Sequence, residues 1–233
     1  AEAVDEAIAA AGAAADYAAS LDEQFGTSDG AFQRIAGMPN SLGKGFGRRM
    51  AGTFAPGDHR LFVPRVFGIG WAINMGAVAV RLGLLRPDDV DDEILTEAAD
   101  QLRPALVAAA VPICLGAVGS ALLVARRDQV ETATGRNQSG NIAVGITMNV
   151  FASGLLAAAA NREVPAEQRL TMPGIAAGLG LLTAGTSTQY ALRPSGQTIV
   201  LAACLAALPS QFLLSYLPVR SVLRRRWASL DRG

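Results

Sequence analysis

Residues 105–125 read ALVAAAVPICLGAVGSALLVA, a run without a charged side chain. An α-helix crosses the ~30 Å hydrocarbon core of a bilayer with about 20 predominantly apolar residues, so this run is long enough to span a membrane. Three more uncharged runs follow it, at residues 142–160, 172–192 and 198–218. We therefore expect an all-α, polytopic membrane protein with four transmembrane helices, preceded by N-terminal cytoplasmic or interfacial helices.

The composition agrees with this expectation and excludes other classes. Of the 233 residues, 51% are hydrophobic and 17% are charged, and the formal net charge is zero. A disordered chain has the opposite balance, and a nucleic-acid-binding protein of this size is normally basic, so we expect no nucleic-acid partner. A single Lys beside nineteen Arg, with abundant Ala and Gly, suggests a GC-rich prokaryotic genome.

A fifth hydrophobic stretch, residues 66–85, contains Arg81 and is better explained as re-entrant, interfacial or packed on the bundle. The arginines support this interpretation, because short cytoplasmic loops are enriched in Lys and Arg. With four crossings and cytoplasmic termini, fourteen membrane-proximal arginines lie on the cytoplasmic side and four lie outside. We expect a multi-pass protein of the plasma membrane with both termini in the cytoplasm.

Composition divides the chain into four parts. We expect an Ala-rich helix and a Gly-rich linker at 1–57, an interfacial motif and an amphipathic helix at 58–104, the transmembrane bundle at 105–219, and a basic cytoplasmic tail at 220–233. Residues 87–104 carry seven acids and one base, whereas the tail carries five bases and one acid. We expect acidic and basic cytoplasmic segments to pair with each other.

The acidic segment predicts a helix with a charged start. Asp88 or Asp89 is expected to cap it, because carboxylates are favourable at the positive N-terminal end of a helix. A cation site is the alternative for these acids, although they lack the ligand order of an EF-hand loop. The predicted apolar face comprises Val90, Ile94, Leu95, Ala98 and Leu102, and Pro104 then marks the entry into the first crossing.

The most distinctive stretch is residues 56–76, PGDHRLFVPRVFGIGWAINMG. It contains the pattern Arg-Leu-Phe-Val-Pro-x-x-Phe-Gly-Ile-Gly-Trp-x-x-Asn, running here from Arg60 to Asn74. This pattern resembles a short domain of unknown function in bacterial and archaeal membrane proteins, some of them in the family of immunity proteins against the sporulation-delaying toxin. His59 stands where the family pattern has a Pro. The resemblance implies no chemistry, and no matching motif in the four-helix part supports an immunity role.

Physically, the motif resembles an anchor that docks on the bilayer or on the bundle. Aromatic and basic residues suit the membrane–water interface, and glycines permit close backbone approach. A ligand pocket around Arg60, Trp71 and Asn74 is the alternative. The candidate interface residues are Arg60, Phe62, Pro64, Gly68, Gly70, Trp71 and Asn74.

The four predicted crossings contain no Asp, Glu, Lys, Arg or His. They contain two cysteines, Cys114 and Cys204, which we expect to be buried and unpaired. The embedded amides Asn149, Gln189 and Gln211 are expected to form hydrogen bonds between helices, or alternatively to line a path for a neutral solute or lipid. Small residues spaced four apart predict close helix packing, at Gly116 with Ser120 and at Gly174 with Gly178.

These features favour a non-enzymatic integral membrane protein, an accessory or assembly subunit that packs against partner helices or associates with itself in the lipid bilayer. A carrier or channel for an uncharged solute or lipid is the first alternative, and a membrane-bound sensor with a cytoplasmic ligand-binding part is the second. The chain has one His and no recognisable catalytic set. We therefore expect no catalytic residues, no metal site and no cofactor.

Overall fold

The computed structural model describes residues 34–35, 38–39, 45–66 and 70–230. Among these, the residues up to 49 together with 64–72 form one compact unit, and residues 50–63 together with those from 73 onward form a second. The expected Ala-rich helix near the N-terminus and Gly68 lie outside the described residues.

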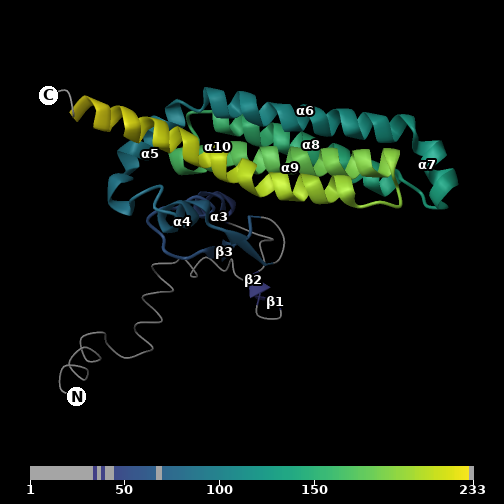
Figure 1. Ribbon diagram of the computed structural model, residues 1–233, viewed down its shortest axis with the longest axis horizontal. Coiled ribbons are helices and arrows are strands. Elements are labelled where there is room, and N and C mark those ends of the chain that lie inside the picture. Colours follow the sequence, from purple (N-terminus) through teal and green to yellow (C-terminus); the bar gives the residue numbers. More distant parts are fainter. Residues whose placement is uncertain (1–33, 36–37, 40–44, 67–69, 231–233) are drawn as a thin grey trace, which may run out of the picture. The chain divides into compact units, whose positions relative to one another are not determined.

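The larger unit is dominated by four long helices that run side by side: α6 (Arg103–Ala125), α8 (Ser139–Ala160), α9 (Ala166–Leu192) and α10 (Thr198–Leu230) (Figure 1). A short helix, α7 (Arg127–Thr134), lies at one end between α6 and α8. Pro104 lies in the first turn of α6, as expected, where a missing N–H costs nothing.

Three of these helices, α6, α8 and α10 up to Ser229, are long and apolar enough to cross a membrane. Four were expected, and α9 differs for a physical reason. It contacts each of the other three helices, and more than half of its 27 residues are buried. A helix enclosed by others needs small side chains for close packing, and its Gly, Ser and Thr residues lower its hydropathy.

Shorter elements complete the described chain. Before the bundle come α3 (Phe46–Gly52), α4 (Met75–Arg81), the 3₁₀ helix η2 (Pro87–Asp89) and α5 (Asp92–Asp100). The chain is thus mostly helical but not purely so. Strand β1 (Arg34–Ile35) pairs antiparallel with β2 (Met38–Pro39), and β3 (Phe62–Pro64) pairs with β4 (Trp71–Ile73). The β3 strand is the extended piece that Pro64 favours.

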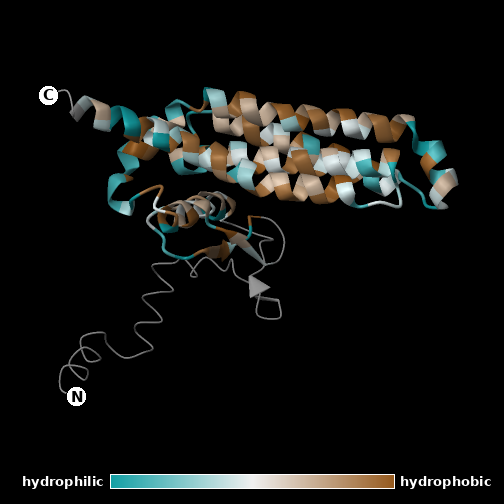
Figure 2. Cartoon of the chain, viewed as in Figure 1, coloured by the Kyte–Doolittle hydropathy of each residue, from teal (hydrophilic) through white to brown (hydrophobic). Residues whose placement is uncertain are grey.

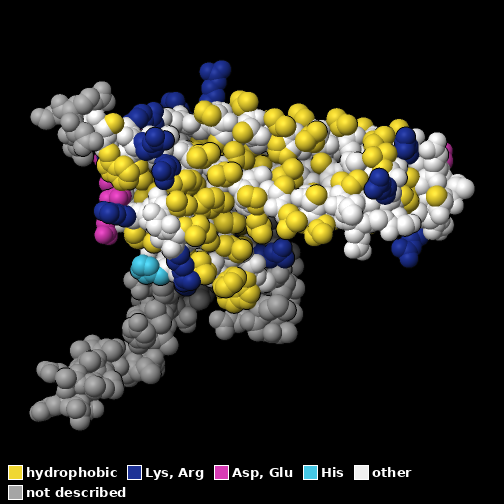
Figure 3. All heavy atoms as spheres, in the orientation of Figure 1, with side chains coloured by type: hydrophobic (Ala, Val, Ile, Leu, Met, Phe, Trp, Pro, Cys, Tyr) yellow, Lys and Arg dark blue, Asp and Glu magenta, His cyan; other side chains and the backbone are white. Residues whose placement is uncertain are grey.

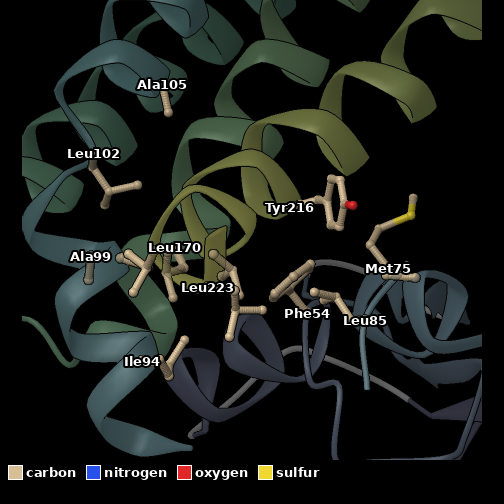
Figure 4. Packing of buried hydrophobic residues seen from close by; sticks show 14 residues of the cluster. Phe54, Met75, Leu85, Ile94, Ala99, Leu102, Ala105, Leu170, Tyr216 and Leu223 are labelled. Atoms are coloured by element: carbon tan, nitrogen blue, oxygen red, sulfur yellow. The ribbon is translucent and has the colours of Figure 1, made fainter. Parts of the chain in front are cut away.

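One core joins the short helices to the bundle. Side chains of α4 and α5 pack there against the start of α9 and the C-terminal half of α10 (Figure 4). The predicted apolar face of α5 is confirmed, because Ile94, Ala98 and Leu102 are buried in this core. Its buried members are Phe54, Met75, Ala79, Leu85, Ile94, Ala98, Ala99, Leu102, Ala105, Leu170, Tyr216, Val219, Val222 and Leu223.

Two local expectations need correction. The cap of α5 is Asp91, whose carboxylate accepts the N–H of Ile94 (2.8 Å), and Asp88 and Asp89 lie earlier, in η2. The expected boundary between residues 219 and 220 falls inside α10, which continues unbroken to Leu230. For residues 66–85 the structure agrees with the expectation that the stretch packs on the bundle, because α4 has only seven residues, too few to cross a membrane, and it packs on α10.

Candidate functional site

Asn74 is the centre of the motif. Its side chain is fully buried, and its Oδ1 accepts three backbone N–H groups, from Ala55 (2.9 Å), Gly76 (3.0 Å) and Ala77 (3.2 Å). Its Nδ2 donates to the carbonyl oxygens of Ala55 (2.9 Å) and Asp58 (3.1 Å). One amide therefore caps α4 and fixes the chain at 55–58 against it, a role that Ala or Leu could not perform.

The backbone of residues 55–56 explains the need for a glycine at position 76, in the first turn of α4. A Cβ at this position would lie 2.6 Å from the backbone nitrogen of Pro56 and 2.7 Å from the carbonyl carbon of Ala55. Backbone atoms cannot move aside as a flexible side chain can. Gly76 and Asn74 together hold the start of the motif at the N-terminus of α4.

Arg60 is engaged within the motif. Its guanidinium donates to both carboxylate oxygens of Asp58, at 3.0 Å and 2.7 Å, and its backbone N–H donates to the same side chain. These hydrogen bonds hold the pKa of Asp58 below its ordinary value, so this carboxylate stays ionised at neutral pH. The pair is partly exposed, and the guanidinium of Arg60 is already engaged in an ion pair with Asp58.

The remaining motif residues divide between surface and turn. Phe62 is 62% exposed, and Trp71, in the smaller unit, is 54% exposed. Gly70 has φ +114° and accepts the N–H of Arg65 through its carbonyl (3.0 Å), so it makes the turn before β4. Pro64 ends β3. Asn74 and Arg60 both contact Asp58, the first through its backbone carbonyl and the second through its carboxylate, and Phe62 and Trp71 are available at the surface.

Arg169 is a structural residue that the sequence did not reveal. It is buried near the start of α9, where it donates to the carbonyl oxygens of Ala159 (3.0 Å) and Ala99 (2.7 Å) and to the carboxylate of Asp100 (3.2 Å). It thus joins the C-terminal ends of α8 and α5, where helix carbonyls lack partners and favour a cation. Its partners lie about 10 and 70 positions away in the sequence, so no local pattern marks it.

The acidic and basic segments do pair, as expected. Arg226, on the C-terminal part of α10, forms ion pairs with Glu93 (2.8 Å) and Glu97 (3.4 Å) of α5. Arg225 donates to the side chain of Gln101. The described part of the tail, up to the end of α10 at Leu230, is therefore helical and packs along α5.

Within the bundle, Asn149 belongs to a polar cluster where α6, α8 and α9 meet. Its Nδ2 donates to Ser120 Oγ (3.5 Å), which lies 3.3 Å from Ser187 Oγ. A Cβ on Gly116 would lie 2.6 Å from Asn149 Oδ1 and 3.0 Å from the carbonyl oxygen of Gly180. The Gly116–Ser120 pair is thus used inside the bundle, where it lets the amide of α8 reach α6.

The second small-residue pair packs α9 against α10. A Cβ on Gly174 would lie 2.7 Å from the backbone oxygen of Gln211, and one on Gly178 would make ordinary contact with Ala207. Gln211 therefore meets α9 through its backbone.

Gln189 lies outside the polar cluster of Asn149. It is buried at the end of α9, where its amide donates to the carbonyl of Arg193 and accepts the N–H of Ile199 (2.9 Å). It closes the turn between α9 and α10. The three amides Asn149, Gln189 and Gln211 consequently have separate neighbours and share no hydrogen-bond partner among those described.

The outer surface of the bundle is apolar. Hydrophobic residues colour α6, α8 and α10, and on the visible face they cover the middle of the bundle (Figures 2 and 3). Cys114 on α6 and Cys204 on α10 are unpaired as expected, but they are exposed rather than buried. The large exposed residues include Val107, Val111, Leu115 and Val118 of α6, Val144, Ile146 and Val150 of α8, and Leu201, Leu205, Leu208, Leu213 and Leu217 of α10.

Comparison with known proteins adds one match. Residues 56–81 match a family of unknown function, DUF5808. The match spans the fold of the motif, from Pro56 beside Gly76 to Arg81 at the end of α4. No curated protein and no solved structure matches the chain.

Proposed function

We propose that the protein is a non-enzymatic integral membrane protein whose helices α6, α8, α9 and α10 cross the bilayer. The main observation in support is that α6, α8 and α10 have an apolar outer surface and surround α9, which packs against them through glycines. Exposed Val and Leu on this scale would be costly in water and are favourable in lipid. At about 1.5 Å per residue, α9 is about 40 Å long, enough to cross with its neighbours.

Charge favours one orientation in the plasma membrane. The end of the bundle that holds Arg103, Arg162 and Arg169 also holds the arginines of the α10 tail, whereas the opposite end holds Arg126, Arg127, Arg136 and Arg193. The first end is more basic, so the positive-inside tendency places it in the cytoplasm together with the C-terminus.

The proposed role is that of an accessory or assembly subunit that packs against a helix of another subunit or of a second copy. The small-residue pairs of α6 and α9 are occupied inside the bundle, so the outer face of α8 is the remaining surface for close helix approach. Along it Gly140, Ala143, Thr147, Gly154 and Ala157 are exposed. A Cβ at Gly140 or Gly154 would meet nothing within 4 Å. By contrast, α6 and α10 present mainly Val and Leu outward, which suits lipid.

Cysteine cross-linking in native membranes tests both parts of this proposal. The full chain should stay with the membrane after alkaline washing and be released by detergent. Gly154→Cys, in a chain with Cys114→Ala and Cys204→Ala, should form a cross-linked adduct with a second copy or another subunit. Chains that keep only Cys114 or only Cys204 are matched controls, because these exposed cysteines lie on the faces assigned to lipid. Release by alkaline washing would contradict membrane insertion, and no adduct at position 154 would contradict the subunit role.

The carrier alternative has less support. A path for a neutral solute would bring polar side chains together along the bundle, yet Gln189 is committed to the α9–α10 turn and Asn149 to the α6 contact. The sensor alternative relied on Arg60 as a ligand-binding group, and Arg60 already binds Asp58.

A further inference from the structure

The turn after α4 exposes leucines between arginines. Helix α4 ends at Arg81, and Gly83, at φ +68°, reverses the chain so that the N–H of Leu84 donates to the carbonyl of Ala79 (2.9 Å). Leu82 is 65% exposed and Leu84 is 37% exposed, whereas Leu85 turns inward to the core. Arg81 and Arg86, on either side of these leucines, are also exposed.

A second exposed segment adjoins this turn. Arg81 donates to the carbonyl oxygen of His59 (3.4 Å), which places the turn beside residues 59–62. In that segment Phe62 is 62% exposed, although the next residue, Val63, is 4% exposed and faces the interior. Both segments belong to the larger unit. We call Arg60, Phe62, Arg81, Leu82, Leu84 and Arg86 the interfacial patch.

The hydrophobic core determines the position of this patch along the long axis of the bundle. Met75, Ala79 and Leu85 pack with Tyr216, Val219 and Val222 of α10 (Figure 4 shows Met75, Leu85 and Tyr216). On α10 the exposed Leu213 precedes this stretch, and the exposed Leu217 and then the exposed Arg220, the first of the tail arginines, lie within it. The outward side chains of α10 thus change from leucine to arginine where α4 is attached. In a membrane helix, such a change marks the boundary between hydrocarbon and headgroups.

We propose that the interfacial patch docks on the anionic headgroup surface of the same membrane that the bundle spans. Phe62, Leu82 and Leu84 enter the boundary of the acyl chains, and Arg81 and Arg86 bind lipid phosphates. Arg60 is already balanced by Asp58, so the net positive charge of the patch comes from the other two arginines. Apolar side chains bracketed by arginines match a surface that is apolar below and negatively charged above. This inference rests on the proposed membrane insertion and adds a lipid-binding surface to it.

Fluorescence quenching by brominated lipids in nanodiscs tests the proposal. A small fluorophore is attached to Leu82→Cys, in the full chain with Cys114→Ala and Cys204→Ala, and the discs contain phosphatidylcholine with or without phosphatidylglycerol. Bromines near the headgroup should quench the label at position 82 at least about twofold more than a label at Thr96→Cys, a matched control at an exposed site on α5. Arg81→Gln with Arg86→Gln should reduce this quenching and remove its dependence on phosphatidylglycerol.

A label on the native Cys204 separates the two proposals. Cys204 is exposed on α10 within the apolar surface, so deep bromines should quench its label if the bundle is inserted. If the label at Cys204 is quenched but the label at position 82 is quenched no more than the label at position 96, the docking proposal alone is overturned. Strong quenching at position 82 that does not depend on phosphatidylglycerol would also overturn it. Absence of quenching at Cys204 overturns membrane insertion itself.

Discussion

Asn74 shows how one buried polar side chain can determine a local fold. All the hydrogen-bonding capacity of its amide oxygen is directed at backbone N–H groups, two of which, at Gly76 and Ala77, belong to buried residues, and its nitrogen donates to the carbonyls of Ala55 and Asp58. Burying such groups unpaired is costly, because they lose their hydrogen bonds to water. The Asn is therefore needed for the motif to fold, independently of any ligand.

Asn74→Ala should destabilise the protein by about 2–4 kcal/mol, through loss of the helix cap and the exposure of unpaired backbone groups. Thermal unfolding in detergent measures this cost. Asn74→Asp is the matched variant, because it keeps the three accepted bonds and loses the two donated ones, so its midpoint should lie between those of Asn74→Ala and the parent. Equal midpoints for Asn74→Ala and the parent would show that the amide network contributes nothing.

Arg169 acts over a longer range, because it links ends of three helices. Arg169→Met keeps a long apolar stem but leaves the carbonyls of Ala99 and Ala159 without their donor, and we expect a loss of about 2–4 kcal/mol in the free energy of unfolding. Arg162→Met, at an exposed arginine seven positions earlier in the α8–α9 connection, should be close to neutral. Comparable losses for the two variants, measured by denaturant titration in detergent, would refute the linking role.

For single residues, the sequence predicts a structural role where the residue pattern is unusual, and it gives no indication of one where the residue type is common. The run from Arg60 to Asn74 was distinctive enough to be singled out, and the structure gives both end residues specific partners. The role of Arg169 was hidden because its partners are backbone carbonyls about 10 and 70 positions away, which no local pattern encodes.

Among the elements, α9 determines how closely the other helices approach. Gly180 lies against the backbone of α6, where a Cβ would be 2.7 Å from both the nitrogen of Ile113 and the carbonyl carbon of Pro112. Pro112 removes a hydrogen bond from α6 at the same level, and the two helices meet backbone to backbone there. In the proposed membrane-spanning bundle such contacts would replace the hydrophobic driving force, because apolar side chains gain nothing by leaving a lipid solvent.

Gly180→Ala should therefore destabilise the bundle by about 1–3 kcal/mol, as expected for overpacking against atoms that cannot move aside. Gly154→Ala makes the same chemical change on α8 in open space and should be neutral or slightly stabilising, since Ala favours helix. Unfolding in mixed micelles with increasing sodium dodecyl sulfate compares the two. A smaller loss at position 180 than at position 154 would contradict the central packing role of α9.

The positions of the helices could be predicted from hydropathy, but their environments could not. The four uncharged runs correspond to α6, α8, α9 and α10, yet only the contacts distinguish the enclosed α9 from helices with an apolar outer surface. The sequence predicts Asp88 or Asp89 as the cap of α5, three or two residues before the observed cap. The reason is that five carboxylates lie within residues 88–93, and more than one of them could cap a helix. The small strands escaped an all-α prediction because each is two or three residues long, too short for a periodic pattern.

For the whole molecule, a net charge of zero conceals strong segregation. The acidic segment at 87–104 and the basic end of α10 neutralise each other through contacts such as Arg226 with Glu93 and Glu97. Long-range charge pairing of this kind gathers α5 and the end of α10 at the end of the bundle where α6 begins. That end is also the one with more arginine, which relates the charge pattern to the proposed orientation.

The number and direction of the crossings can be measured on this basis. In a chain with Cys114→Ala and Cys204→Ala, Asn161→Cys probes the α8–α9 connection and Ser195→Cys probes the α9–α10 connection, at opposite ends of α9. A membrane-impermeant thiol reagent added to intact cells should label position 195 and reach position 161 only after the membrane is opened. Asn137→Cys, in the α7–α8 connection, is the matched control and should behave like position 195. Labelling of 161 and 195 from the same side would mean that α9 does not cross, and labelling of 161 alone in intact cells would reverse the orientation that the arginines predict.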